Sequence, residues 1–253
     1  MTADPVLVDV DGPVATITLN RPEARNAINP ALLAALAEAM AEADAAENVH
    51  AVVLTGADPA FCAGLDLREL TGLHDAVTSA TGSPWPPIGK PVVAAVNGPA
   101  VTGGLELVLN CDVVICSDRA RFADTHARVG VLPGWGLTVL LPLAVGRARA
   151  RQMSLTGDFV PADQALAAGL VSEVVPHDDL LARAGTIAAT IAGNNQRAVR
   201  ALLASYREVE AELVAGGYDA EARAARSWAA TDLDLAESTR RRSAVVDRGR
   251  RQT

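Results

Sequence analysis

The stretch Asn97-Gly98-Pro99-Ala100-Val101-Thr102-Gly103-Gly104-Leu105-Glu106 is the most informative part of this sequence. It follows Pro91–Val96, an apolar run that predicts a buried strand, and it leads into Leu105–Leu109, which predicts the start of a helix. Two glycines at such a junction leave backbone N–H groups uncovered at the positive end of the helix dipole. The stretch therefore predicts a site for an anion, or for an oxygen that becomes one.

A second loop of this kind lies upstream, at Phe61-Cys62-Ala63-Gly64-Leu65-Asp66. It also follows a β-like run, Ala51–Thr55. Two such loops together predict a pair of backbone donors around one oxygen, which is an oxyanion hole. Glu106 stands one turn into the predicted helix, where it would face whatever binds.

Several further segments occur along the chain in a recognisable order. They are Leu19–Ala27 (Leu-Asn-Arg-Pro-Glu-Ala-Arg-Asn-Ala), Ala60–Asp66, Lys90–Gly98, the Gly103–Glu106 turn, Leu155–Gly157 and Ala165–Val171. Together they resemble the enoyl-CoA hydratase/isomerase (crotonase) family over nearly the whole chain. The resemblance implies an α/β fold of the ClpP/crotonase type. In that fold a spiral of ββα units forms two roughly perpendicular sheets, with residues 1–160 as the core and residues 161–253 as a C-terminal helical trimerisation region.

Composition excludes several other classes of protein. The chain has 253 residues and a formal net charge of −8, which argues against a general nucleic-acid surface. Half of the residues are hydrophobic but only 3% are aromatic, so Ala, Val and Leu must build the core. Its beginning has no basic-then-apolar signal and no apolar run is long enough to cross a membrane, which predicts a cytoplasmic protein. Cys62, Cys111 and Cys116 lack metal-ligand spacing and are expected to be free thiols.

Local patterns predict most of the elements. Val6–Val10 and Val14–Leu19 flank Asp11-Gly12-Pro13 as a hairpin, and Pro30–Ala45 is a helix with Asn29 as its N-cap. The remaining expected elements are a strand at Asp112–Ser117 and helices at Pro161–Ala168, Asp178–Ala192, Gln196–Ala215 and Asp219–Val246, the last broken near Thr231. Residues 71–90 are expected to form a loop, either a pocket lid that carries Trp85 or an ordinary surface loop.

The resemblance assigns roles in thioester chemistry to particular residues. The N–H groups of Leu65 and Gly103 would form the oxyanion hole, and Gly103 would let a thioester approach because it has no Cβ. Glu106 corresponds to the first of the two catalytic carboxylates of the family and would hold a water or act as a base.

The second catalytic carboxylate is missing from this sequence. His126 occupies the matching position within Phe122–Gly130. An imidazole titrates near neutral pH and could donate or accept the proton at the α-carbon. Two alternatives are that His126 only hydrogen-bonds Glu106 or Asp124, and that Asp124 replaces the carboxylate.

Residues expected to contact coenzyme A or the acyl group also follow from the resemblance. They are Ala24, Arg25, Ala63, Asp66, Leu67, Arg68, Gly104, Gly134 and Trp135. Trp135 would narrow the acyl site or fix His126, or else fill core volume. Lys90 is the only lysine, so phosphate contacts would depend mainly on arginine. The basic run Arg240–Arg242 and Arg248–Arg251 is interpreted either as a solvated helix end or as a contact for phosphate or a neighbouring subunit.

The expected activity is that of an enoyl-CoA hydratase, a lyase of fatty acid metabolism that adds water to a 2-enoyl-CoA. The alternatives are double-bond isomerisation or another thioester reaction in the same oxyanion hole, and binding of acyl-CoA without turnover. The expected partners are an acyl-CoA thioester and further copies of the chain, as a homotrimer or a hexamer built from two trimers. No metal and no cofactor apart from the substrate's own coenzyme A are expected, nor any nucleic acid or membrane.

Overall fold

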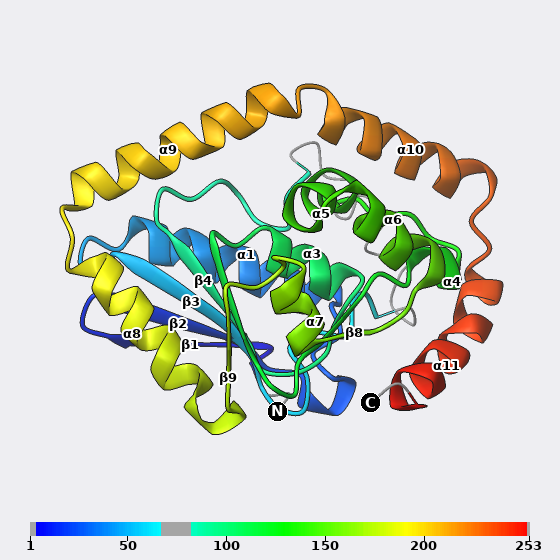
Figure 1. Cartoon of the computed structure of the whole chain (residues 1–253), viewed down its shortest axis with the longest axis horizontal. Helices are drawn as coiled ribbons and strands as arrows, with labels where there is room; N and C mark the ends of the chain where they lie inside the picture. The colour runs from blue at the N-terminus through cyan, green and yellow to red at the C-terminus, as the bar shows by residue number, and fades with distance from the viewer. Residues whose placement is uncertain (1–3, 67–81, 252–253) are drawn as a thin grey trace.

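Two β-sheets form the centre of the fold (Figure 1). The computed structural model describes residues 4–66 and 82–251. In this part of the chain, one sheet has six strands in the order β1-β2-β3-β4-β6-β9, and the other has three in the order β5-β7-β8. The strands are β1 Val6–Asp11, β2 Val14–Leu19, β3 Ala51–Gly56, β4 Val92–Val96, β5 Ala100–Val101, β6 Val113–Ser117, β7 Arg121–Ala123, β8 Val160–Pro161 and β9 Glu173–Val175.

The predicted N-terminal hairpin is confirmed. Strands β1 and β2 pair in antiparallel fashion from Val6 opposite Leu19 to Asp11 opposite Val14. Gly12 in the connecting turn has a φ of +55°, a conformation that glycine adopts without steric cost. From β2 onward each neighbouring pair in this sheet is parallel, so the carboxyl ends of these strands gather at one edge.

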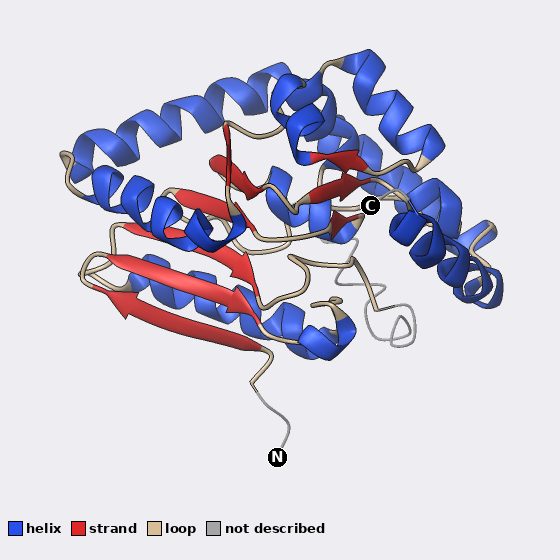
Figure 2. Cartoon of the chain, turned by 60° about the horizontal axis from the view of Figure 1, so that its bottom comes forward, coloured by secondary structure: helices blue, strands red, loops and turns tan. Residues whose placement is uncertain are grey.

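Helices cover both faces of the six-stranded sheet (Figure 2). Val53, Val93 and Ala95 pack with Ala184 and Ala188 of helix α8 (Leu180–Ala192) on one face. The alternate residues of the same strands, including Val52, Leu54, Ala94 and Val96, pack on the other face with apolar residues of helix α1 (Pro30–Ala45). Burial on both faces explains why these strands read as continuous apolar runs in the sequence.

Helix α1 begins where the sequence predicted. The side chain of Asn29 accepts a hydrogen bond from the N–H of Leu32 at 2.9 Å, and Pro30 is the first helical residue. At the other end, the buried Lys90 donates from Nζ to the carbonyls of Ala43 and Ala46, at 2.7 and 2.6 Å. The only lysine of the chain therefore caps the C-terminal end of α1.

The C-terminal helices run in an arc around the outside of the sheets (Figure 1). Helix α9 is Gln196–Leu213, α10 is Gly217–Thr231 and α11 is Leu235–Arg251, and the break after Thr231 was predicted. Helix α11 packs on α4 (His126–Val129), and α10 packs on α5 (Leu137–Val145). The remaining helices of the described residues are α3 Gly103–Leu109, α6 Arg147–Thr156, α7 Ala162–Ala167 and the short 3-10 segments Pro22–Ala24 (η1) and His177–Asp179 (η3).

The first elements after residue 160 contribute to the sheets as well as to the surface. Strand β9 pairs with β6 at the edge of the six-stranded sheet, and α8 packs across its centre. The predicted division at residue 160 stays a prediction. Residues 82–90 form neither helix nor strand, as the sequence predicted. Trp85, in this segment, is buried in the main core. Residues 71–81 of the predicted loop lie outside the described residues. In the described chain, no helix combines the length and apolarity that crossing a bilayer demands.

Candidate active site

The loop at residues 61–66, called the oxyanion loop after its predicted role, lies against the loop at residues 97–104. The backbone of Cys62 exchanges hydrogen bonds of 3.1 and 2.9 Å with residues 99–101. Beyond this bridge, the Cα of Gly64 lies 3.7 Å from the position that a Cβ on Gly103 would occupy. The backbone therefore brings Leu65 and Gly103, the two predicted donors, close together.

The N–H groups of Leu65 and Gly103 are available to a ligand. Leu65 forms a parallel bridge with Ile28, and Ile28 bonds to the residues on either side of Leu65, so the N–H of Leu65 points the other way. Gly103 is the first residue of α3, where an N–H has no acceptor within the helix. Within residues 4–66 and 82–251, neither group donates a backbone hydrogen bond.

The neighbouring glycines serve different purposes. A Cβ on Gly104 would lie 2.2 Å from the carbonyl oxygen of Cys62, and a Cβ on Gly64 would lie 2.3 Å from Oγ1 of Thr102. Close packing of the two loops therefore requires glycine at both positions. A Cβ on Gly103 would meet nothing nearer than 3.5 Å, so packing leaves room for a methyl group there. Packing alone therefore does not require glycine at position 103.

Glu106 lies within the first turn of α3 and is 2% exposed. Its Oε1 accepts the backbone N–H groups of Gly134 and Trp135, at 3.1 and 2.7 Å. The side-chain amide of Asn110, the C-cap of this helix, donates to the carbonyl of Trp135 at 2.9 Å. The loop at residues 134–135 thus holds one carboxylate oxygen of Glu106, and the other oxygen, Oε2, faces away from these two N–H groups toward His126.

His126 lies next to that second oxygen. Its Nε2 is 3.6 Å from Oε2 of Glu106, and its Nδ1 is 2.6 Å from Oδ1 of Asp124. The imidazole is 6% exposed, so both contacts are shielded from water. The hydrogen bond between His126 and Asp124, which one of the alternatives predicted, is therefore present. The ring also faces Glu106.

Glu106, Asp124 and His126 form a buried cluster of titratable side chains, and their pKa values depend on burial and on the charges beside them. Burial raises the pKa of Glu106 to about 7, while the charge of His126 and the N–H of Trp135 oppose that rise. Burial acts to lower the pKa of His126, but Asp124 and then Glu106 outweigh it and raise the pKa above the ordinary 6.5. Burial acts to raise the pKa of Asp124, but His126 holds it below the usual range. The cluster therefore favours a carboxylate at Asp124 and the imidazolium form of His126.

Trp135 is close to the oxyanion loop. Its Cζ3 would lie 3.5 Å from a Cβ on Gly103, and the side chain is almost fully buried within the main core. The ring therefore both fills core volume and limits the space over Gly103. It holds Glu106 through its backbone N–H.

The residues predicted to contact coenzyme A divide into several groups. Arg25 is exposed in a left-handed conformation, and its carbonyl accepts the N–H of Ala63 at 3.0 Å, which places Ala24, Arg25 and Ala63 beside the oxyanion loop. Asp66 is buried and pairs with Arg21 at 3.4 Å, so this carboxylate is part of the loop's own structure. Leu67 and Arg68 lie outside the described residues.

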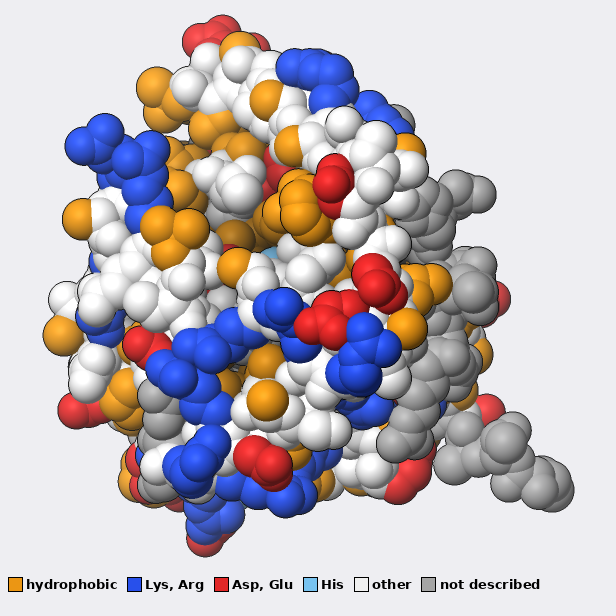
Figure 3. All heavy atoms as spheres, turned by 90° about the vertical axis from the view of Figure 1, so that its right-hand side faces the viewer, with side chains coloured by type: hydrophobic (Ala, Val, Ile, Leu, Met, Phe, Trp, Pro, Cys, Tyr) orange, Lys and Arg blue, Asp and Glu red, His pale blue; other side chains and the backbone are white. Residues whose placement is uncertain are grey.

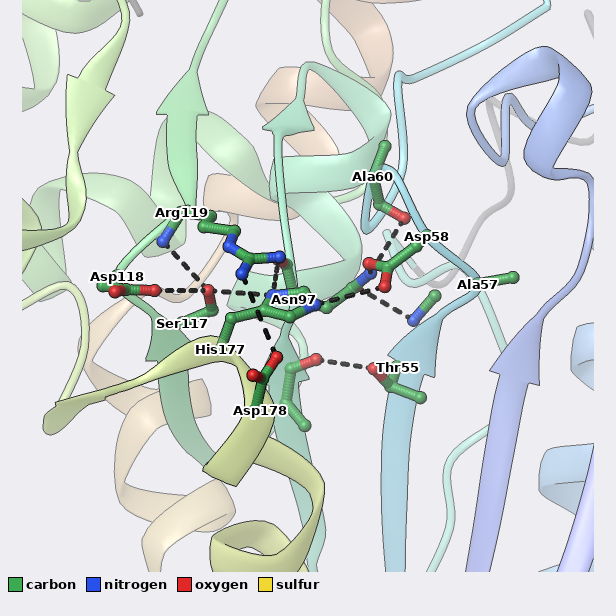
Figure 4. A network of polar contacts seen from close by, with 12 residues as sticks. Thr55, Ala57, Asp58, Ala60, Asn97, Ser117, Asp118, Arg119, His177 and Asp178 are labelled. Atoms are coloured by element: carbon green, nitrogen blue, oxygen red, sulfur yellow. Dashed lines mark hydrogen bonds and ion pairs between the residues drawn. The ribbon is translucent and has the colours of Figure 1, made fainter.

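A polar network holds the ends of three strands beside these loops (Figure 4). The side chain of Asn97 accepts the N–H of Gly56 at 3.3 Å and donates to Asp58 at 2.9 Å. His177 lies between Oδ2 of Asp58 and the carbonyl of Asn97, each 3.1 Å away. Ser117 lies 3.2 Å from the same imidazole, but it is fully buried and its Oγ accepts the N–H of Arg119. This Ser-His-Asp grouping is a scaffold and has no accessible nucleophile.

The basic C-terminal helix is largely paired within the subunit. Arg240 and Arg241 bond Glu237, Arg250 lies 3.7 Å from Asp247, and Arg248 bonds Asp158. Figure 3 shows basic side chains gathered across the lower half of the face that includes this helix. These pairs support the interpretation of a solvated helix end.

The cysteines have no bond to one another. Cys62, Cys111 and Cys116 are free, and burial raises the pKa of Cys62 to about 12. A nucleophilic thiolate in the oxyanion loop is therefore disfavoured.

Sequence reasoning missed two residues that organise the site. Glu221 on α10 is buried, and its carboxylate accepts the N–H groups of Gly136 and Thr138, each at 2.6 Å, just after the loop that holds Glu106. Asn26 is fully buried and donates to the carbonyls of Ala57 and Ala60, each at 2.7 Å. The Arg-Pro-Glu-Ala-Arg-Asn motif could have identified Asn26, whereas no local pattern marks Glu221.

The chain is similar in sequence and in fold to known enoyl-CoA hydratases. The family model for enoyl-CoA hydratase/isomerase matches residues 9–238. A probable enoyl-CoA hydratase of Mycobacterium bovis is 40% identical over 205 residues, which cover 79% of this chain and 80% of the relative. The crystal structure of an enoyl-CoA hydratase from Mycobacterium avium has a TM-score of 0.85 and 53% identity over 90% of this chain and 98% of its own. That of an enoyl-CoA hydratase from Mycobacterium tuberculosis H37Rv has a TM-score of 0.84 and 54% identity over 90% and 99%. The chain has the crotonase fold and belongs to the enoyl-CoA hydratase/isomerase family.

Proposed function

We propose that this protein is an enoyl-CoA hydratase, which adds water across the α,β double bond of a 2-enoyl-CoA. The observation that carries the proposal is the Glu106–His126 pair, whose facing atoms are 3.6 Å apart beside two available backbone N–H groups. The names of the similar proteins support the same reaction. In this proposal the thioester oxygen is bound by the N–H groups of Leu65 and Gly103, which stabilise the enolate that addition creates.

The two buried side chains divide the proton transfers between them. Oε2 of Glu106 takes a proton from water as the hydroxide oxygen bonds to the β-carbon. The double-bond electrons move toward the carbonyl oxygen and form the enolate. Nε2–H of His126 then protonates the α-carbon, and the proton held by Glu106 returns to His126. One water is consumed and both side chains regain their starting charge.

Hydration of crotonyl-CoA, followed by loss of the ultraviolet absorbance of the enoyl thioester, tests the proposal. We expect turnover by the natural chain and a loss of roughly 100- to 10,000-fold in Glu106→Gln and His126→Ala, since each removes a proton-transfer group. His50→Ala is the matched control, because His50 directly precedes β3 and, in the described chain, no hydrogen bond or ion pair joins its side chain to the cluster. Calorimetry should show that Glu106→Gln binds acyl-CoA within a few-fold of the natural chain.

The alternatives give different results in the same assay. Binding of crotonyl-CoA without turnover would indicate an acyl-CoA carrier or sensor, and gain of hydration in His126→Glu would strengthen that conclusion. Turnover of a 3-enoyl-CoA without hydration would indicate an isomerase.

The same proposal includes a contact for coenzyme A, a cellular location and an oligomeric state. Arg25 is exposed beside the oxyanion loop and is the described arginine that we assign to coenzyme A phosphate. The chain works in the cytoplasm as a homotrimer or a hexamer of two trimers. The support for assembly is α9, which has no buried residue although apolar side chains lie along it.

A further inference from the structure

Asp124 is tied to His126 by two contacts. It follows β7 directly, and His126 is the first residue of α4. Oδ1 of Asp124 accepts the backbone N–H of His126 at 3.1 Å and lies 2.6 Å from its Nδ1. Ser154 of α6 also helps to hold the pKa of the same carboxyl group down. One carboxylate thus fixes both the backbone and the ring of His126.

These contacts determine which ring nitrogen carries a hydrogen. An ionised carboxylate only accepts hydrogen bonds, so Nδ1 of His126 must be the donor to Asp124. In the neutral imidazole the hydrogen then stays on Nδ1, and Nε2 is the atom that gains and loses a proton. Nε2 is also the atom that faces Oε2 of Glu106.

We propose that Asp124 is a positioning residue for His126: it holds the hydrogen on Nδ1 and directs Nε2 toward Glu106 and the α-carbon of the substrate. The inference rests on the proposed hydratase function for its effect on rate. It also predicts a tautomer that can be observed without turnover. In this arrangement an Asp-His pair supplies the acid that the family takes from a second glutamate.

The surrounding charges favour the same arrangement. Asp124 and Glu106 contact the ring on opposite sides, and Glu221 of α10 adds a more distant negative charge. The nearby cations on α4 and α11 are engaged elsewhere, because Arg128 and Arg248 both pair with Asp158. The imidazolium of His126 is therefore flanked by carboxylates.

Nitrogen-15 NMR of the four histidines tests the tautomer directly. The signals of His126 are assigned from their loss in His126→Ala. In the full-length natural chain we expect Nδ1 to stay protonated through the titration while Nε2 changes. A neutral ring with its hydrogen on Nε2 would overturn the inference, whether or not the protein hydrates crotonyl-CoA.

Asp124→Asn tests the effect on the reaction. The amide oxygen can still accept from Nδ1 but carries no charge, so the pKa of His126 should fall and the alkaline limb of the rate profile should move to lower pH. We expect kcat to fall by about 10- to 100-fold with KM little changed, a smaller loss than removing an acid–base group outright. Asp124→Glu should restore part of the rate, and Asp118→Asn, an exposed aspartate after β6, is the matched control.

The outcomes separate the two proposals. An active natural chain whose pH profile is unchanged in Asp124→Asn would overturn the role of Asp124 and leave the hydratase proposal intact. An inactive natural chain with the expected tautomer would overturn the hydratase proposal alone. If Asp124→Asn fails to fold, Ser154→Ala removes a hydroxyl that helps to hold the pKa of Asp124 down, and it should shift the alkaline limb in the same direction. No shift would count against the inference.

Discussion

At the scale of single residues, Glu106 and His126 must be in opposite protonation states to act. Glu106 accepts a proton only as a carboxylate, so the rate should rise with pH through its pKa, which burial raises to about 7. His126 donates only as an imidazolium, so the rate should fall as pH rises through its pKa, which lies above 6.5. We expect a bell-shaped profile of kcat/KM whose limbs report the coupled pair.

The variant His126→Gln assigns the alkaline limb of that profile. Glutamine cannot donate as an imidazolium does, so the residual rate should rise with pH and then level off. Rates for crotonyl-CoA measured from pH 5 to 10 check this, with His50→Gln as the control. Persistence of the alkaline limb in His126→Gln would assign that limb to another group.

Gly103 and Gly104 are adjacent but should respond differently to an added methyl group. Gly104→Ala places a Cβ against the carbonyl of Cys62 and should lower the free energy of unfolding by about 1–3 kcal/mol. Gly103→Ala meets nothing nearer than 3.5 Å, so the protein should fold normally. Its methyl group intrudes on the thioester, and kcat/KM should fall by roughly 10- to 100-fold as the oxyanion is displaced from its donor.

Thermal unfolding and hydratase kinetics of the two variants check this difference. Gly185→Ala is a suitable control, because a Cβ there meets nothing within 4 Å. Normal kinetics in a stable Gly103→Ala protein would place the thioester elsewhere.

Candidate site residues could be predicted from the sequence where they lie within short, recognisable motifs. Leu65 and Gly103 were assigned from the family resemblance that the two loop motifs carry, and Glu106 from its place one turn into the predicted helix. The structure brings all three residues close together. For Asp124 the sequence left two alternatives open, a hydrogen bond to His126 and a replacement for the missing carboxylate. The structure contains the hydrogen bond, which depends on how the chain turns from β7 into α4. Residue types alone do not predict a backbone turn of that kind.

At the scale of elements, α5 depends on a carboxylate from a distant helix. Its first N–H groups lack intrahelical acceptors, and Glu221 accepts those of Gly136 and Thr138. Glu221→Ala should therefore lower the free energy of unfolding by about 1–3 kcal/mol, because the buried N–H of Gly136 and the partly buried N–H of Thr138 lose their acceptor. Since Gly134 and Trp135 immediately precede this cap and hold Glu106, kcat should fall as well.

Chemical denaturation and crotonyl-CoA kinetics measure both effects of Glu221→Ala. The control is Glu212→Ala, an exposed glutamate on α9. A stable Glu221→Ala protein with full activity would show that α5 and the Glu106 loop do not depend on this contact.

Elements with strong local signals were predicted nearly to the residue. Asn29 and Pro30 mark the start of α1, and the apolar runs mark β3, β4 and β6. Strands β5, β7, β8 and β9 were missed because two or three residues are too few to show a period. Their pairing is decided by the tertiary fold, as when β9 joins the edge of the sheet beside β6.

At the scale of the whole molecule, α9 is the element that a single subunit does not explain. Leu202, Tyr206, Val209 and Leu213 recur at helical spacing and are 59%, 67%, 54% and 75% exposed. An apolar stripe of this length on one helix face favours a protein partner over water. Since the helix runs along the outside of the subunit (Figure 1), further copies of the chain can reach it.

If α9 joins subunits, charges in its stripe should separate them. We expect light scattering at micromolar concentration to give the mass of a trimer or hexamer for the natural chain and a lower mass for the double variant Leu202→Glu/Leu213→Glu. The control replaces Glu208 and Glu212, exposed polar residues of the same helix, with lysine and should keep the mass. Both replaced leucines are exposed, so circular dichroism should show that the double variant folds. A monomeric natural chain would refute the assembly, and an unchanged mass in the leucine variant would place the subunit contact on another face.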